Sequence, residues 1–353
     1  MTFSGVCIFF FGITLGLGLF VDVTLRKSYF YLLFCTLILL RIYFPPVAFV
    51  DYNNYSYIIN GLLSGSITNL GLYEISSKLL LYLPARIAGD LDTGLYITYI
   101  LIMALGLFIF SQLLNKYKIN NSNLIVLSAF FVPLLLFVTI RAFVPYVLIT
   151  LIYLNRMKFN TVNILLFLLS LSFHISTALI ILPVIIVWLS GYFKDKQLLF
   201  LLTVFFITFA FALAFKLMDM RYIFENIKFL LPSKLGIYKV FFDQSVNFNF
   251  NGHFLYLFII FIFVFVVLLC FGFITDTIYM AQTLSFCSVF FVLSFSPVIA
   301  YRFSIFFLIP SLLTIDYKKT IKYSNKYTRM ITLLLVATIF YINFNYVLVP
   351  SYR

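Results

Sequence analysis

Charged and metal-binding side chains are scarce in this sequence. Only 10% of its 353 residues are charged, whereas an ordinary soluble domain has about 25%. Histidine occurs twice, tryptophan once and cysteine four times, and neither a Cys-x-x-Cys nor a His-Glu-x-x-His spacing is present. These shortages exclude a soluble enzyme, a disordered protein and a secreted disulfide scaffold, and they argue against a histidine-rich metal site.

Apolar residues, by contrast, make up 64% of the chain, including 47 phenylalanines. Runs of about 20 apolar residues can each cross the bilayer core as a helix, whereas the strands of a membrane barrel alternate polar and apolar residues. We therefore predict an all-α, polytopic integral membrane protein, with one transmembrane domain over residues 1–353 and no soluble domain. The apolar runs are 3–21, 28–44, 94–114, 124–154, 159–190, 198–217, 253–274, 278–296, 298–315 and 330–349.

The net charge of +13 reflects topology rather than nucleic-acid binding. Basic residues concentrate in short connections between the apolar runs, as they do in cytoplasmic loops. We therefore expect membrane lipids, and no nucleic acid, around this chain. The clusters are Arg26/Lys27, Lys116/Lys118, Arg156/Lys158, Lys194/Lys196 and the group Lys318, Lys319, Lys322, Lys326 and Arg329.

Two of the apolar runs are too long for one ordinary span. Runs 124–154 and 159–190 each carry one ionisable residue near the middle, Arg141 and His174, and each has basic loops on both sides. A single span would place one basic loop outside, so we predict that each run is a hairpin that turns at its ionisable residue. This gives about twelve transmembrane helices; the alternative is ten, with Arg141 and His174 near mid-membrane.

In the twelve-span topology two longer segments face the outside, at about 45–93 and 218–252. The first contains Ile75–Ala88, which Lys78 and Arg86 interrupt, so it predicts an interfacial or re-entrant helix rather than a span. The second mixes charged and aromatic residues, Arg221 among them. That composition suits a cover over a glycolipid, and it equally suits a solvated loop.

Three arginines fall near the expected outer face. Arg141 precedes Ala142 and could lie on the first turn of a helix, where exposed N–H groups favour anions; Arg302 and Arg41 lie near span ends. An arginine in an apolar run raises the free energy of membrane insertion by roughly 2.5–3.5 kcal/mol, so it needs a partner or a water-filled cavity. Guanidiniums suit phosphate or pyrophosphate. The alternative is structural ion pairing or snorkelling to lipid headgroups.

Acid, imidazole and aromatic side chains complete the candidate set. His174 could act as a general base or donate to a bound phosphate, although a lone histidine is often only a hydrogen-bonded packing residue. Asp51, with Tyr52 and Tyr55, has the composition of a sugar site, and Glu74 is a second acidic candidate. The alternative for these residues is an aromatic belt with solvated acids.

The order of these motifs resembles the EpsG-like and Wzy-type bacterial polysaccharide polymerases. The likeness covers roughly residues 40–190, with Tyr301-Arg302 as a weaker match near the C-terminus. The family's usual glycine before the Asp-Tyr pair is replaced by Phe49-Val50, and no glutamine follows Arg141. The matching elements are Arg41, Asp51-Tyr52-x-x-Tyr55, Glu74, Ile140-Arg141-Ala142 and Ser172-Phe173-His174-x-Ser176-x-Ala178-Leu179.

The resemblance implies a GT-C-like glycosyltransferase in the bacterial inner membrane. Such an enzyme joins undecaprenyl-pyrophosphate-linked oligosaccharide repeat units on the outer face into O-antigen, capsule or exopolysaccharide. It needs no metal or other cofactor, and a chain-length regulator protein is an expected partner.

In that reaction we expect Arg141 and Arg302 to hold the pyrophosphate, with Arg41 or Arg221 assisting. Tyr301, Tyr52 and Tyr55 are further expected substrate contacts. The general base is Asp51, Glu74 or His174, and the sequence leaves this choice open.

Three other functions compete. A flippase or other transporter of lipid-linked oligosaccharide usually shows internal repeats and charges on several faces of a cavity, whereas the charges here gather on one side. A membrane O-acyltransferase has a similar size, but no histidine precedes His174 to supply its usual arrangement. An O-antigen ligase shares the substrates and is the nearest rival.

Overall fold

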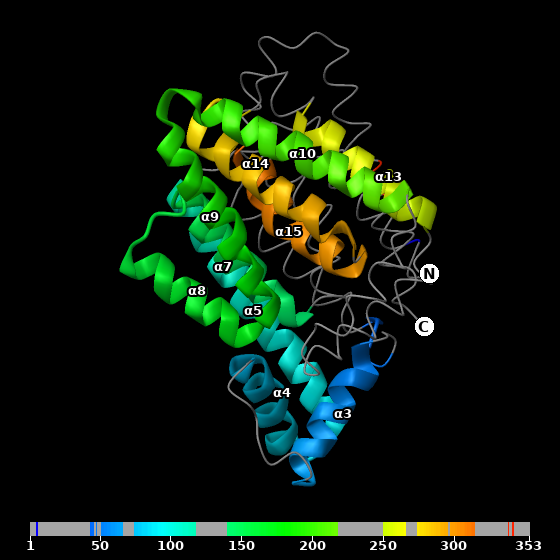
Figure 1. Cartoon of the computed structure of the whole chain (residues 1–353). Coiled ribbons are helices and arrows are strands. Elements are labelled where there is room, and N and C mark those ends of the chain that lie inside the picture. Colours follow the sequence, from blue (N-terminus) through cyan, green and yellow to red (C-terminus); the bar gives the residue numbers. More distant parts are fainter. Residues whose placement is uncertain are drawn as a thin grey trace. The chain divides into compact units, whose positions relative to one another are not determined.

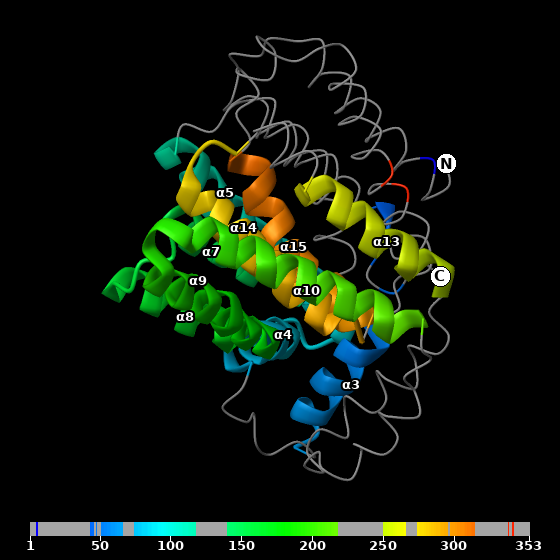
Figure 2. The same ribbon diagram turned by 45° about the horizontal axis from the view of Figure 1, so that its top comes forward.

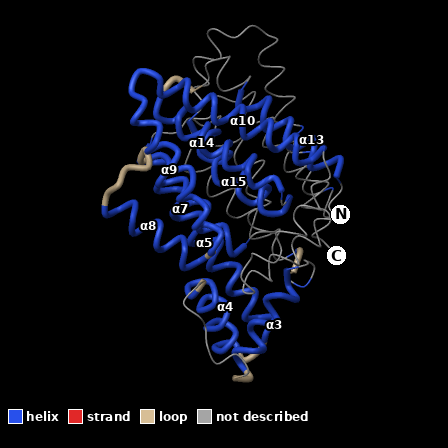
Figure 3. The backbone as a smooth tube through the Cα atoms, in the orientation of Figure 1, coloured by secondary structure: helices blue, strands red, loops and turns tan. Residues whose placement is uncertain are grey.

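Every element described in the computed structural model is a helix (Figures 1 and 3). The structure describes residues 51–65, 74–117, 140–217, 250–265, 274–295 and 297–314, together with positions 5, 43–45, 47, 338 and 341. The α-helices are α3 (Asp51–Leu63), α4 (Ile75–Ala88), α5 (Leu91–Tyr117), α7 (Ile140–Leu154), α8 (Thr161–Phe173), α9 (Ile181–Ser190), α10 (Gln197–Leu217), α13 (Phe250–Ile262), α14 (Thr277–Val292) and α15 (Pro297–Thr314). Short 3-10 helices are η2 (Ile175–Ile180), η3 (Gly191–Lys196) and η7 (Leu293–Phe295).

Three helical stretches are long and apolar enough to cross a membrane: Leu91–Ile109, Ile175–Phe193 and Gln197–Phe215. Shorter apolar helices cover Arg141–Leu154, Thr161–Phe173, Leu255–Phe265, Thr277–Val292 and Ile299–Thr314. These helices support the predicted all-helical membrane architecture. The count of twelve or ten spans stays a prediction, because the runs 3–21, 28–44 and 330–349 lie almost entirely outside the described residues.

The chain divides into two compact units. The first comprises Met1–Ala178, Leu312–Tyr317 and Asn343–Arg353; the second comprises Leu179–Ser311 and Lys318–Ile342. In the first unit α4 packs on α5, α5 on α7, and α7 on α8, while α3 lies against α4 and α5 (Figures 1 and 2). This unit contains Glu74, Arg141 and His174.

Helix α4 has the bounds of the stretch Ile75–Ala88 that the sequence predicted to be helical; its location at a membrane surface stays a prediction. It ends at Gly89, whose φ of 76° is the left-handed conformation that glycine adopts without a Cβ clash. Its contact with α5 is close, because a Cβ on Gly94 would overlap the backbone of Ala85. The buried hydroxyl of Thr98 on α5 also donates to the Leu80 carbonyl of α4 at 2.7 Å.

Helices α7 and α8 form an antiparallel hairpin around a short loop. Arg156 and Met157 adopt positive φ in this loop, and the Asn160 side chain caps α8 by accepting from the Asn163 N–H at 2.8 Å. Asn163 in turn donates to the Lys158 carbonyl at 2.8 Å. Each helix is about 20 Å long at 1.5 Å per residue, so the start of α7 and the end of α8 meet at the same end of the hairpin.

The second unit is built around α10 and α14, with α9 and η3 beside them. Aromatic rings fill its core: Phe209 stacks on Phe261 with centroids 4.0 Å apart, and Phe205 contacts Phe291 edge-on at 5.6 Å. Helix α15 joins this core through the Ser304 hydroxyl, which lies 2.6 Å from the hydroxyl of Tyr256.

Candidate functional site

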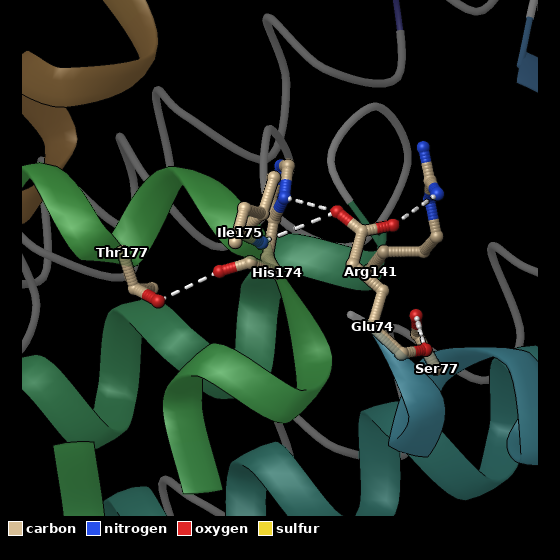
Figure 4. Close-up of polar contacts among 6 residues, drawn as sticks. All are labelled: Glu74, Ser77, Arg141, His174, Ile175 and Thr177. Atoms are coloured by element: carbon tan, nitrogen blue, oxygen red, sulfur yellow. Dashed lines mark hydrogen bonds and ion pairs between the residues drawn. The ribbon is translucent and has the colours of Figure 1, made fainter. Parts of the chain in front are cut away.

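Three ionisable side chains meet in the first unit around the carboxylate of Glu74 (Figure 4). Its Oε2 atom accepts a hydrogen bond from Arg141 Nη1 at 3.0 Å, and its Oε1 atom lies 2.8 Å from His174 Nδ1. The backbone N–H of Ile175 also donates to Oε1, at 3.2 Å. Both carboxylate oxygens are therefore engaged, one by the guanidinium and one by the imidazole.

The local fold explains why these residues converge. Arg141 is the second residue of α7, and His174 directly follows the last residue of α8, so the hairpin brings both to one end. Glu74 immediately precedes α4, which packs against α8. The Ser76 and Ser172 hydroxyls lie 2.7 Å apart and link these two helices next to the cluster.

The backbone of Glu74 adopts a strained conformation. Its φ of 57° and ψ of 30° are left-handed, and such conformations cost of order 1–3 kcal/mol for residues other than glycine. The Ser77 hydroxyl donates to the Glu74 carbonyl at 3.0 Å (Figure 4). The Lys78 N–H donates to the same carbonyl at 3.0 Å. These bonds, together with the contacts to Arg141 and His174, hold the carboxylate in place.

The guanidinium of Arg141 also lies over an aromatic ring. Its Cζ atom lies 5.2 Å from the centroid of the Tyr55 ring, and Tyr55, on α3, is buried with 1% of its surface exposed. A second ring supports the first, because Tyr99 on α5 meets Tyr55 edge-on at 6.2 Å. A cation over an aromatic face gains about 0.5–2 kcal/mol, depending on how far it is desolvated. The Arg141 side chain nevertheless keeps 28% of its surface exposed.

Burial by itself would raise the pKa of Glu74, but the surrounding donors have the larger combined effect. The hydrogen bond from His174, the positive charge of Arg141 and the Ile175 N–H together lower the pKa of Glu74 to about 2. The carboxylate is therefore ionised at neutral pH. An ionised carboxylate can only accept hydrogen bonds, so Nδ1 of His174 is the donor in this contact.

His174 interrupts the helical path of the chain. Helix α8 ends at Phe173, and His174 is extended, with φ −153° and ψ 120°, before η2 begins at Ile175. The run 159–190 is thus divided at the residue where the sequence predicts a turn. No described residue forms a hydrogen bond with Nε2 of His174, and the side chain is 13% exposed.

The other predicted site residues lie on α3, on α15 or outside the described residues. Asp51 is the first residue of α3, and Tyr52 on the same helix donates to Asp92 of α5 at 2.7 Å. Tyr301 and Arg302 lie on α15 in the second unit, so a pyrophosphate site shared by Arg141 and Arg302 stays a prediction. Arg41 and Arg221 lie outside the described residues.

The sequence interpretation missed one contributor to the cluster and one contact of another. The Ile175 N–H is a backbone group and has no sequence signal. Tyr55 was expected to contact substrate, which stays a prediction, and the structure adds that its ring lies under the guanidinium of Arg141. A tyrosine four residues after Asp51 carries no indication of which cation will cover it.

No group of three His, Cys, Asp or Glu side chains in the described ranges is arranged to hold a metal ion. Comparison of the chain with protein-family models, with curated proteins and with solved structures finds no match. The chemistry of the cluster formed by Glu74, Arg141 and His174 is therefore the basis on which a function can be argued.

Proposed function

We propose that this protein is a membrane glycosyltransferase that polymerises undecaprenyl-pyrophosphate-linked oligosaccharide repeat units on the outer face of the bacterial inner membrane. The observation that carries the proposal is the contact of Glu74 with both Arg141 and His174, which joins an acid–base group to a cation that suits phosphate. The ordered motifs that resemble the EpsG-like and Wzy-type polymerases supply the substrate class.

The reaction needs a cation near the leaving group. When the glycosidic bond to the lipid pyrophosphate breaks, negative charge develops on the phosphate oxygens, and a preorganised donor there lowers the barrier. Arg141 is suited to this because Glu74 and Tyr55 fix its orientation while 28% of its side chain stays exposed. Arg302, on α15, is the second arginine that we assign to the pyrophosphate, with Arg41 or Arg221 assisting.

The reaction also needs a group that accepts the proton of the attacking sugar hydroxyl. Imidazole and carboxylate are the usual groups for this step. The cluster contains one of each within hydrogen-bonding distance, and both flank helices, α4 and α8, that pack against each other. No nucleotide sugar, metal or other cofactor enters this scheme.

The test is a gel of surface polysaccharide from a strain in which this gene is deleted. The strain is complemented with the wild-type protein, with Arg141→Ala or with Arg86→Ala. Arg86 is a matched control because it is an exposed arginine in the last turn of α4, at the opposite end of that helix from Glu74, and its guanidinium hydrogen-bonds Tyr82 at 2.6 Å. Immunoblots of the membrane fraction check that each variant inserts.

We expect the deletion strain to display single repeat units without a ladder, and wild type and Arg86→Ala to restore the ladder. Arg141→Ala should insert but not restore it. An intact ladder in the deletion strain would contradict the proposal and favour a modifying enzyme such as an acyltransferase. Absence of even single repeat units from the surface would instead favour a flippase, and repeat-unit chains that polymerise but stay on the carrier lipid would favour a ligase.

A further inference from the structure

We propose that His174 is the general base for the acceptor hydroxyl and that Glu74 is its positioning residue, which fixes the imidazole with Nδ1 as donor and Nε2 as acceptor. This assignment rests on the proposed glycosyl transfer and deepens it. It selects one base from the three that the sequence left open, namely Asp51, Glu74 and His174.

The geometry assigns the two nitrogen atoms of His174 different roles. Nδ1 lies 2.8 Å from Oε1 of Glu74, and that oxygen also accepts from the Ile175 N–H at 3.2 Å. A neutral imidazole that donates through Nδ1 presents a lone pair at Nε2. The Thr177 hydroxyl donates to the His174 carbonyl at 2.6 Å and fixes the backbone beside the ring (Figure 4).

The same contacts make Glu74 unsuited to take the proton itself. Its two oxygens already accept from Arg141, His174 and the Ile175 N–H, and only 8% of the residue is exposed. The low pKa of Glu74 agrees with this, because a carboxylate that binds protons so weakly is a poor base near neutral pH. A carboxylate of this kind orients and stabilises an imidazolium instead.

In the proposed step, the acceptor hydroxyl transfers its proton to Nε2 of His174, and its oxygen forms a bond to the anomeric carbon of the donor. The bond from that carbon to the pyrophosphate oxygen breaks, and the leaving lipid pyrophosphate keeps the electron pair. The imidazolium, stabilised by the Glu74 carboxylate, then loses the proton to solvent.

Other charged groups near the imidazole of His174 contribute to the pH dependence of the reaction. Glu74 contacts it directly, and Arg141 on α7 reaches it through Glu74. Lys78 lies one turn further along α4, and its N–H bonds the Glu74 carbonyl. Helix α8 itself, Thr161–Phe173, carries no ionisable side chain. A pH profile must therefore be compared between variants that leave Arg141 and Lys78 in place.

The experiment uses the full-length protein in lipid nanodiscs and the lipid-linked repeat unit extracted from the deletion strain. The pH dependence of kcat and KM is measured for wild type, Glu74→Gln, Glu74→Asp, His174→Asn and the double variant Glu74→Gln/His174→Asn. His174→Asn is informative because the asparagine amide can keep the position of Nδ1 and its donation to Glu74 while Nε2 is lost. Membrane yield and thermal stability are recorded for each variant.

We expect His174→Asn to insert normally, to lose at least about 10²-fold in kcat and to lose the acid limb of the pH profile. Glu74→Gln should lose about 10²–10⁴-fold in kcat with little change in KM, because the imidazole loses the carboxylate that orients it. Glu74→Asp should recover part of the rate. The double variant should be about as slow as His174→Asn alone, since the two residues act as a unit.

Three results would overturn the assignment. His174→Asn could retain wild-type kcat, or Glu74→Gln could lose only stability while keeping wild-type kcat, or the double variant could be far slower than His174→Asn. If Glu74→Gln does not accumulate in the membrane, Glu74→Asp and His174→Asn decide the question by the same criteria. Failure of the wild-type protein to form any polymer would count against the proposed function rather than against the role of Glu74.

Discussion

Glu74 and His174 are 100 positions apart in the sequence, yet Oε1 of Glu74 lies 2.8 Å from Nδ1 of His174. The contact joins the residue before α4 to the residue after α8, and Arg141 at the start of α7 completes it through the other carboxylate oxygen. A buried carboxylate that contacts both a guanidinium and an imidazole avoids the cost of an unpaired buried charge.

Replacing Arg141 should abolish polymer formation. Arg141→Ala removes both the cation over Tyr55 and the donor to Glu74, and loss of one comparable preorganised donor costs about 10²–10³ in rate. Arg141→Lys should recover little, because a lysine ammonium lacks the planar fork of a guanidinium. Polymer yield per unit of inserted protein measures the effect, with Arg86→Ala as the control. Wild-type chain lengths from Arg141→Ala would remove Arg141 from the site.

Acid should destabilise the protein partly through Glu74. The pKa of Glu74 is about 2 in the folded protein and 4.5 without its partners, so the ionised group contributes stability that is fully present above pH 4.5. That stability is lost as the pH falls toward 2, and the pKa difference corresponds to at most about 3 kcal/mol. Thermal unfolding of wild type and Glu74→Gln in detergent, at pH 7 and at pH 3, measures it. The difference in melting temperature between the two proteins should be smaller at pH 3 than at pH 7. An equal difference at both pH values would contradict a stabilising role for the ionised Glu74.

The close approach of α4 and α5 should not tolerate a side chain at Gly94. A Cβ there overlaps the Ala85 backbone, so Gly94→Ala must push the helices apart, and overpacking of this kind typically costs 1–3 kcal/mol. Because α4 follows Glu74 directly, activity should fall with stability. Gly191→Ala is the matched control, since a Cβ at Gly191 meets no atom within 4 Å. Equal melting temperatures for the two variants would contradict this account of the packing.

The loop between α7 and α8 provides a test of the span number. In the twelve-span topology this loop is cytoplasmic, and in the ten-span topology it is outside. Phe159 in the loop is 82% exposed, so a thiol introduced by Phe159→Cys should be reachable on one side only. We expect a membrane-impermeant maleimide to label this cysteine in inverted vesicles and not in intact spheroplasts. In each case the labelling is compared with that of the unsubstituted protein. Labelling in intact spheroplasts would establish the ten-span topology instead.

Helix content and the bounds of one unusual segment could be predicted from sequence because hydropathy and charge are local properties. The stretch Ile75–Ala88, interrupted by Lys78 and Arg86, indicated a helix with the bounds that α4 has. The break at His174 followed from the spacing of basic loops on either side of run 159–190. The remaining topology depends on runs that lie outside the described residues.

The roles within the candidate site could not be assigned in the same way. Asp51, Glu74 and His174 were all candidate bases from the sequence, because each is an ionisable residue near the expected outer face. Which oxygen meets which donor depends on the left-handed backbone at Glu74 and on the length match of α7 and α8, and neither feature is visible in a hydropathy pattern. Tyr55 likewise became the support of Arg141 only through the packing of α3 against α5.

Composition and hydropathy thus predict an apolar, helical chain suited to a membrane, and they single out the few charges within its apolar runs. The contacts among Glu74, Arg141 and His174 emerge only when the helices pack. The burial of an apolar run depends on its own residues, whereas an ion pair between distant residues depends on how separate helices pack.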